Sequence, residues 1–106
     1  MQHLAKFVYL KVRPEKKTDF MQLLEVNRLH TQNEPGTLEW TLMSVEGEPD
    51  SVAMFETYDG QQGSDEHDKS PALAAVLAAL GDSVESEPVI MNLVVDRYKL
   101  DDPPER

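Results

Sequence analysis

Four stretches of this chain have the alternating or β-rich composition of strands. They cover residues 4–12, 37–45, 51–58 and 89–100. The first stretch is apolar on both of its alternating faces, with Leu4, Val8, Leu10 and Val12 on one and Ala5, Phe7 and Tyr9 on the other. We therefore expect this strand to be covered on both sides.

Two stretches have helical periodicity. The first begins near Pro14 and runs to about Asn33, before the helix-stopping turn of residues 34–36. Its inward stripe is apolar at the start and polar at the end, with Phe20, Leu23, Leu24, Asn27 and Thr31, and with His30 at the border. The polar end marks either the point where the helix leaves the core or one end of a pocket.

The second helix is predicted over residues 71–80, with Ser70 as its N-cap and Pro71 in its first turn. Leu73, Val76, Leu77 and Leu80 form its expected buried stripe, and Gly81 is expected to end it. The second and third strands are joined by a polar turn over residues 46–50, which favours an antiparallel hairpin. Leu38, Trp40 and Leu42 are expected to share one face of the second strand.

The resulting order is β-α-β-β-α-β within one domain of 106 residues, with residues 101–106 as a frayed tail. This order predicts an α+β, ferredoxin-like fold with an antiparallel sheet and both helices on one face. The other sheet face then needs a cover, because the first strand is apolar on both sides. A second copy of the chain is the simplest cover, so we expect a homodimer.

Charge and composition exclude several kinds of partner. The net charge is −10, which disfavours nucleic acid and anionic membrane surfaces. The chain has no cysteine, and neither a phosphate-binding glycine loop nor a convincing metal cluster is present, so we expect no cofactor. Neither a signal peptide nor a membrane-spanning segment is recognisable, and we expect a soluble cytoplasmic protein.

Residues 55–71 hold the densest chemistry, with Glu56, Tyr58 and His67. Residues 59–69 are predicted to form a polar loop with one short helical turn from Ser64. An imidazole titrates near neutral pH and can act as a base. Alternatively, His67 is a solvated residue among acidic neighbours, and Glu56 pairs with a cation across the sheet.

These features together resemble the antibiotic biosynthesis monooxygenase family of dimeric α+β barrels. The resemblance covers residues 7–98 and rests on residues 12–20, the turn of residues 34–36, Glu56 with Tyr58, and His67 before Ser70-Pro71. The chain departs from the family in its glycine-rich residues 60–67. It also has Tyr58 where haem-degrading members have tryptophan, so we discount that branch.

The resemblance implies an enzyme that uses no metal or prosthetic group and oxidises a small phenol or quinol with O2. His67 would take the phenolic proton, and Tyr58 or Asn33 would stabilise the oxyanion. The remaining substrate-binding candidates are Asn27, His30, Trp40 and Glu56, while Phe7 and Phe55 are candidates to enclose the ring. Two alternatives stay open: an isomerase on the same scaffold, and a dimer that binds a small molecule without catalysis.

Overall fold

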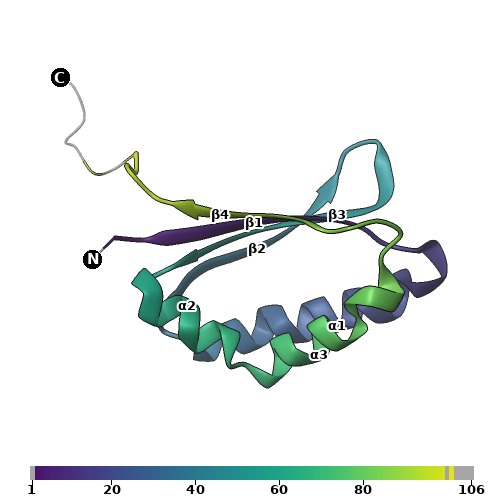
Figure 1. Cartoon of the computed structure of the whole chain (residues 1–106), viewed down its shortest axis with the longest axis horizontal. Helices are drawn as coiled ribbons and strands as arrows, with labels where there is room; N and C mark the ends of the chain where they lie inside the picture. Colours follow the sequence, from purple (N-terminus) through teal and green to yellow (C-terminus); the bar gives the residue numbers. More distant parts are fainter. Residues whose placement is uncertain (1, 100, 102–106) are drawn as a thin grey trace.

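The fold is a four-stranded antiparallel sheet with the helices on one face (Figure 1). A computed structural model of the chain describes residues 2–99 and 101. The strands are β1 (Leu4–Lys11), β2 (Thr37–Val45), β3 (Glu48–Tyr58) and β4 (Val89–Val94), in the spatial order β2-β3-β1-β4. The main helices are α1 (Lys17–His30), α2 (Gly60–Asp68) and α3 (Pro71–Ser83), with short 3-10 turns η1 (Pro14–Lys16) and η2 (Thr31–Asn33). The predicted ferredoxin-like α+β fold is confirmed.

The core lies between the sheet and the helices α1 and α3. Alternation along β1 directs Val8 and Leu10 toward the helices, opposite Met54 and Val52 of β3. Phe20 and Leu24 of α1 fill the space above them, and each is only 1% exposed. Roughly 1.5–3 kcal/mol of stabilisation comes from burying one such side chain. The α1 stripe predicted from the sequence is therefore the one that packs on the sheet.

Two strand predictions need correction. The hairpin turn is shorter than expected, because β3 begins at Glu48 directly after Gly47, which has a φ of +80°. Pro49 fits within β3 because it precedes Ser51, the first residue to pair with β1, so no hydrogen bond to β1 is lost. Leu38 does not share the face of Trp40, because a register shift between Thr37 and Glu39 turns its side chain outward, where it is 47% exposed.

Two helix predictions also need correction. Residues 60–68 form a continuous helix, α2, rather than a loop with one turn. Helix α3 continues through Gly81 to Ser83, whose hydroxyl donates to the Ala79 carbonyl at 2.7 Å. The Ser70 cap is confirmed, since its Oγ accepts hydrogen bonds from the Ala72 and Leu73 amides. Leu77 is not buried in the stripe but is 58% exposed.

The last strand ends at Val94 rather than at residue 100, which lies outside the described residues together with 102–106 of the predicted tail. Every side chain of β4 is exposed. Figure 1 shows the helices on one side of the sheet only, and no described element covers the other side. The exposed face carries Phe7 and Phe55, which pair across β1 and β3.

Candidate functional site

A cavity of about 150 Å³ lies between the sheet and the helices. Its wall is mostly apolar, with Leu24 from α1, Met54 from β3 and Val76 from α3 among the contributors. The polar side chains that reach it are Lys6, Asn27, Glu56, His67 and Asp68. An apolar chamber with a few convergent polar groups is the usual form of a small-molecule site.

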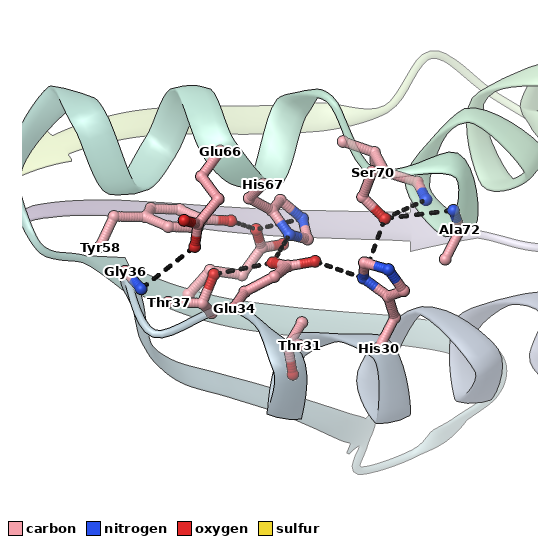
Figure 2. Close-up of polar contacts among 12 residues, drawn as sticks. His30, Thr31, Glu34, Gly36, Thr37, Tyr58, Glu66, His67, Ser70 and Ala72 are labelled. Atoms are coloured by element: carbon pink, nitrogen blue, oxygen red, sulfur yellow. Dashed lines mark hydrogen bonds and ion pairs between the residues drawn. The ribbon is translucent and has the colours of Figure 1, made fainter.

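His67 is the most enclosed of these polar groups, at 1% exposure. Its Nδ1 lies 2.7 Å from Oε1 of Glu34, a residue that is itself only 4% exposed (Figure 2). Because a carboxylate only accepts hydrogen bonds, the contact fixes the proton on Nδ1 and leaves the Nε2 lone pair free. Nε2 lies on the side of Glu56, 3.9 Å from its Oε1. The interpretation of His67 as a solvated surface residue is therefore wrong.

Glu34 is the centre of the polar network. Its Oε2 lies 2.6 Å from His30 Nδ1, and its Oε1 accepts the Thr37 hydroxyl at 2.9 Å in addition to His67. Burial by itself raises the pKa of the Glu34 carboxyl, but the hydrogen bonds from His67, His30 and Thr37 outweigh it and the net pKa lies below its ordinary value. Glu34 is thus held as a carboxylate that orients His67.

A close contact of two glycines brings Glu34 and His67 together. Gly36 follows Glu34 in the turn, and Gly63 lies one helical turn before His67 in α2. A Cβ built on Gly63 would lie 2.4 Å from the Gly36 carbonyl oxygen, so only glycine permits this approach. The Asp59 amide donates to the Gly36 carbonyl at 2.8 Å, and the Gly36 amide donates to Glu66 at 3.2 Å.

Glu56 and Tyr58 form a second polar pair, on the inward face of β3. The Tyr58 hydroxyl donates to Glu56 Oε1. Burial raises the pKa of Glu56, although the Tyr58 hydrogen bond and the nearby His67 oppose this change. Burial and the neighbouring Glu56 raise the pKa of Tyr58, so its phenol stays protonated and acts as a donor. Glu56 therefore accepts the Tyr58 hydroxyl and lies 3.9 Å from His67 Nε2, while Lys6, opposite it on β1, is the nearby cation.

His30 connects the network to the surface of the protein. Its side chain is 36% exposed, and its Nδ1 lies near Glu34 and, at 3.3 Å, near Ser70 Oγ. Ser70 also caps α3, so one hydroxyl joins the ends of two helices (Figure 2). The end of α1 thus supports the buried carboxylate, with His30 contacting Glu34 instead of lining the cavity.

The predicted site residues fall into three groups. Asn27, Glu56 and His67 line the cavity. Tyr58 contacts Glu56 and His30 contacts Glu34, and Tyr58 also lines an adjacent polar hollow that shares Lys6 and Asp68 with the cavity. Asn33 is exposed and Trp40 packs against the core, so neither is a lining residue. Phe7 and Phe55 lie on the uncovered sheet face and do not line the cavity, so the expectation that they enclose a substrate ring there is wrong.

The sequence pattern did not single out Glu34 as a functional residue. It precedes Pro35-Gly36, so the local pattern indicates only a helix stop at this point. Nothing in the local pattern indicates that the Glu34 side chain points inward. Its role depends on His67 of α2, which lies 33 positions further along the chain.

Residues 4–79 match the family of antibiotic biosynthesis monooxygenases (ABM). The chain belongs to the ABM family. The match extends from β1 to most of α3 and therefore contains every residue of the polar network. No group of three or more His, Cys, Asp or Glu side chains among the described residues is arranged to hold a metal ion.

Solved structures share this ABM fold over most of their length. Rv0793 from Mycobacterium tuberculosis superposes with a TM-score of 0.84 at 21% identity, covering 92% of this chain and 98% of that one. A "putative antibiotic biosynthesis monooxygenase" from Caulobacter crescentus CB15 is 26% identical, with a TM-score of 0.79 and coverage of 87% and 88%. A conserved protein from Methanosarcina mazei Go1 is 22% identical, with a TM-score of 0.78 and coverage of 87% and 91%.

The search of the curated proteins found no match to this ABM chain. Among the described helices, none has the length and apolar character needed to cross a membrane.

Proposed function

We propose that this protein is a monooxygenase that oxidises a small phenol or quinol with O2, without a metal or prosthetic group. The observation that carries the proposal is the buried Glu34–His67 pair at the polar end of an apolar cavity. Such a pair can act as a base, with His67 Nε2 as the atom that accepts a proton from a ligand in the cavity. The family match supports monooxygenase chemistry in general, and the cavity of about 150 Å³ favours a small substrate.

The first step is removal of the phenolic proton by His67 Nε2. Glu34 holds the Nδ1–H tautomer of His67 and stabilises the imidazolium that forms. Glu56 lies on the Nε2 side of the same imidazole. The apolar wall excludes water from the phenolate, which strengthens these electrostatic contacts. A phenolate gives an electron to O2 far more readily than the neutral phenol does.

The overall reaction needs no reductant besides the substrate. One atom of O2 forms a bond to a ring carbon and the other leaves as water, while the phenol is converted to a quinone and supplies all four electrons. His67 can return its proton to the reduced oxygen. Glu56 and Tyr58 then serve as a fixed hydrogen-bonded wall beside the reacting oxygen.

A second function is favoured by the raised pKa of Glu56 beside His67. Two proton carriers on one apolar cavity also suit the enolisation of a small carbonyl compound, which is isomerase chemistry. The isomerase would not consume O2, so oxygen dependence separates the two functions. A dimer that only binds a small molecule would leave its ligand chemically unchanged, with O2 and without it.

We also propose that the active form is a homodimer. Large apolar side chains stay exposed on β4, among them Met91 at 47% and Leu93 at 39%. In the register of the sheet Met91 lies opposite Phe7, so the apolar surface is continuous from β4 to β1 on the uncovered face. A second copy of the same face is a self-complementary cover.

The test of the proposed function is O2 uptake by purified, chelator-treated protein with a panel of phenols and hydroquinones, corrected for autoxidation. The expected result is uptake above the control with one oxygen atom from labelled O2 in the product. His67→Gln should abolish most of this uptake. Turnover of a carbonyl substrate without O2 would support the isomerase instead, and unchanged ligands in both assays would support binding alone.

A further inference from the structure

The side chain of Asn27 is a buried polar group that the fold leaves unsatisfied. Asn27 is 2% exposed and lines the cavity from α1. Its Oδ1 is enclosed, and none of the described residues offers its amide a hydrogen bond. Leaving a buried polar group unpaired is costly, and native proteins rarely do so without a reason.

A bound ligand would supply the missing partner. Among the described residues, the other buried atom without a partner is Trp40 Nε1, but Trp40 does not line the cavity. Asn27 therefore differs from Trp40 in facing the space where a small molecule can bind. An amide group placed in an apolar wall is the usual means of orienting such a molecule.

The polar side chains of the cavity come from two sides. Lys6, Glu56, His67 and Asp68 belong to β1, β3 and α2, whereas Asn27 belongs to α1 and makes no hydrogen bond to any of them. A cavity of about 150 Å³ accommodates one benzene-sized ring. A ring that hydrogen-bonds to both His67 and Asn27 must carry a polar atom, such as an oxygen, for each.

We propose that Asn27 is a specificity-determining residue that binds a second ring oxygen, so that the substrate is a single-ring quinol. This inference rests on the proposed function. An amide accepts from a hydroxyl and, after turning about its terminal bond, donates to a carbonyl. It therefore fits an oxygen that is a hydroxyl in the substrate and a carbonyl in the product.

The chemistry of a quinol requires this change. O2 adds one oxygen atom to a ring carbon and releases the other as water, and both original hydroxyls lose their protons to become carbonyls. The product is a hydroxyquinone, and the ring is again the sole source of electrons. His67 binds one of the two changing oxygens and Asn27 binds the other.

The test compares the binding of hydroquinone and phenol, which differ only in the second oxygen, by NMR titration without O2. The wild type should bind hydroquinone roughly tenfold or more tightly than phenol. Asn27→Leu should lose this preference while its phenol affinity stays within about twofold, because phenol does not use the amide. Asn27→Asp should keep the preference, because its carboxyl still accepts from a hydroxyl.

Retained phenol binding shows that the Asn27→Leu variant is folded. The inference is overturned if wild-type protein binds the two ligands equally, if it binds neither, or if Asn27→Leu keeps the preference for hydroquinone. O2 uptake does not enter these measurements. A protein that prefers hydroquinone through Asn27 but never consumes O2 would keep this inference and lose the proposed oxidation.

Discussion

Glu34 and His67 lie 33 positions apart in the chain, yet the Glu34 Oε1 and His67 Nδ1 atoms are 2.7 Å apart and both residues are buried. A carboxylate and an imidazole in this arrangement restrict the histidine to one tautomer. The orientation of the Nε2 lone pair, and with it the proposed chemistry, depends on this contact.

The first prediction concerns the pair itself. His67→Gln should lower kcat roughly 100-fold or more, because it removes the base. Glu34→Gln should also lower kcat with little change in KM, because the tautomer is no longer imposed while the cavity wall stays intact. Steady-state O2 uptake with the best quinol of the panel measures both effects. Glu15→Gln makes the same chemical change at an exposed position and serves as the control.

An unchanged kcat in His67→Gln would show that His67 is not the base. In that case Glu56, whose pKa is raised by burial, would be the next proton acceptor to replace.

The second prediction concerns stability against pH. The Glu34 pKa is lowered from 4.5 in the fold, so its carboxylate stabilises the protein above that pH and the contribution is lost as the pH falls through the folded value. The Glu56 pKa is raised from 4.5, so its ionisation destabilises the fold as the pH rises through the folded value. The two carboxyls should therefore respond to amidation with opposite signs.

Urea unfolding at a fixed protein concentration measures this difference. At pH 7, Glu34→Gln should have a lower free energy of unfolding than wild type, and Glu56→Gln a higher one. Both differences should shrink as the pH falls, that of Glu56→Gln as the pH falls to 4.5 and that of Glu34→Gln only below 4.5, because the folded pKa of Glu34 lies below that value. Equal shifts in the same direction for both variants would contradict the opposite environments of the two carboxyls.

The third prediction concerns the contact of Gly63 with Gly36. In most helices Gly→Ala stabilises by about 0.5–1 kcal/mol. Gly63→Ala should instead lower the free energy of unfolding by about 1–3 kcal/mol, because its Cβ would lie 2.4 Å from the Gly36 carbonyl oxygen. It should also lower kcat, because α2 carries His67.

Gly81→Ala is a matched control for this substitution. Gly81 also lies within a helix, α3, but a Cβ added there would meet nothing within 4 Å. This variant should be more stable than wild type and equally active. If Gly63→Ala behaved like Gly81→Ala, the glycine contact would not be what positions α2.

The fourth prediction concerns the proposed dimer. Met91→Glu places a charge on the exposed apolar surface of β4 and should shift the protein toward the monomer, because the charge would be buried against the second copy. Light scattering coupled to gel filtration measures the mass. Val26→Glu makes the same change at a 56% exposed position of α1 and should leave the dimer intact. A wild-type mass of one chain at high micromolar concentration would refute the dimer.

The order of strands and helices could be predicted from the sequence, because periodicity and helix stops are local signals. The β1 pattern, the α1 stripe of Phe20 and Leu24, and the Ser70 cap depend on residues close in the chain. The helix α2 could not be predicted in the same way. Its glycines have low helix propensity, and they are tolerated because Gly63 packs on Gly36 of a distant turn.

The candidate site shows the same division. Local pattern identified His67, Glu56 and Asn27 as chemically capable side chains, but it gave no measure of their burial or of the partner of each. The tertiary structure decided that Glu34 binds His67, that Asn27 has no partner among the described residues, and that Trp40 lies away from the cavity. Residue types and their periodicity are local properties of the sequence. The burial of a side chain and its hydrogen-bond partners are decided only when distant segments pack together.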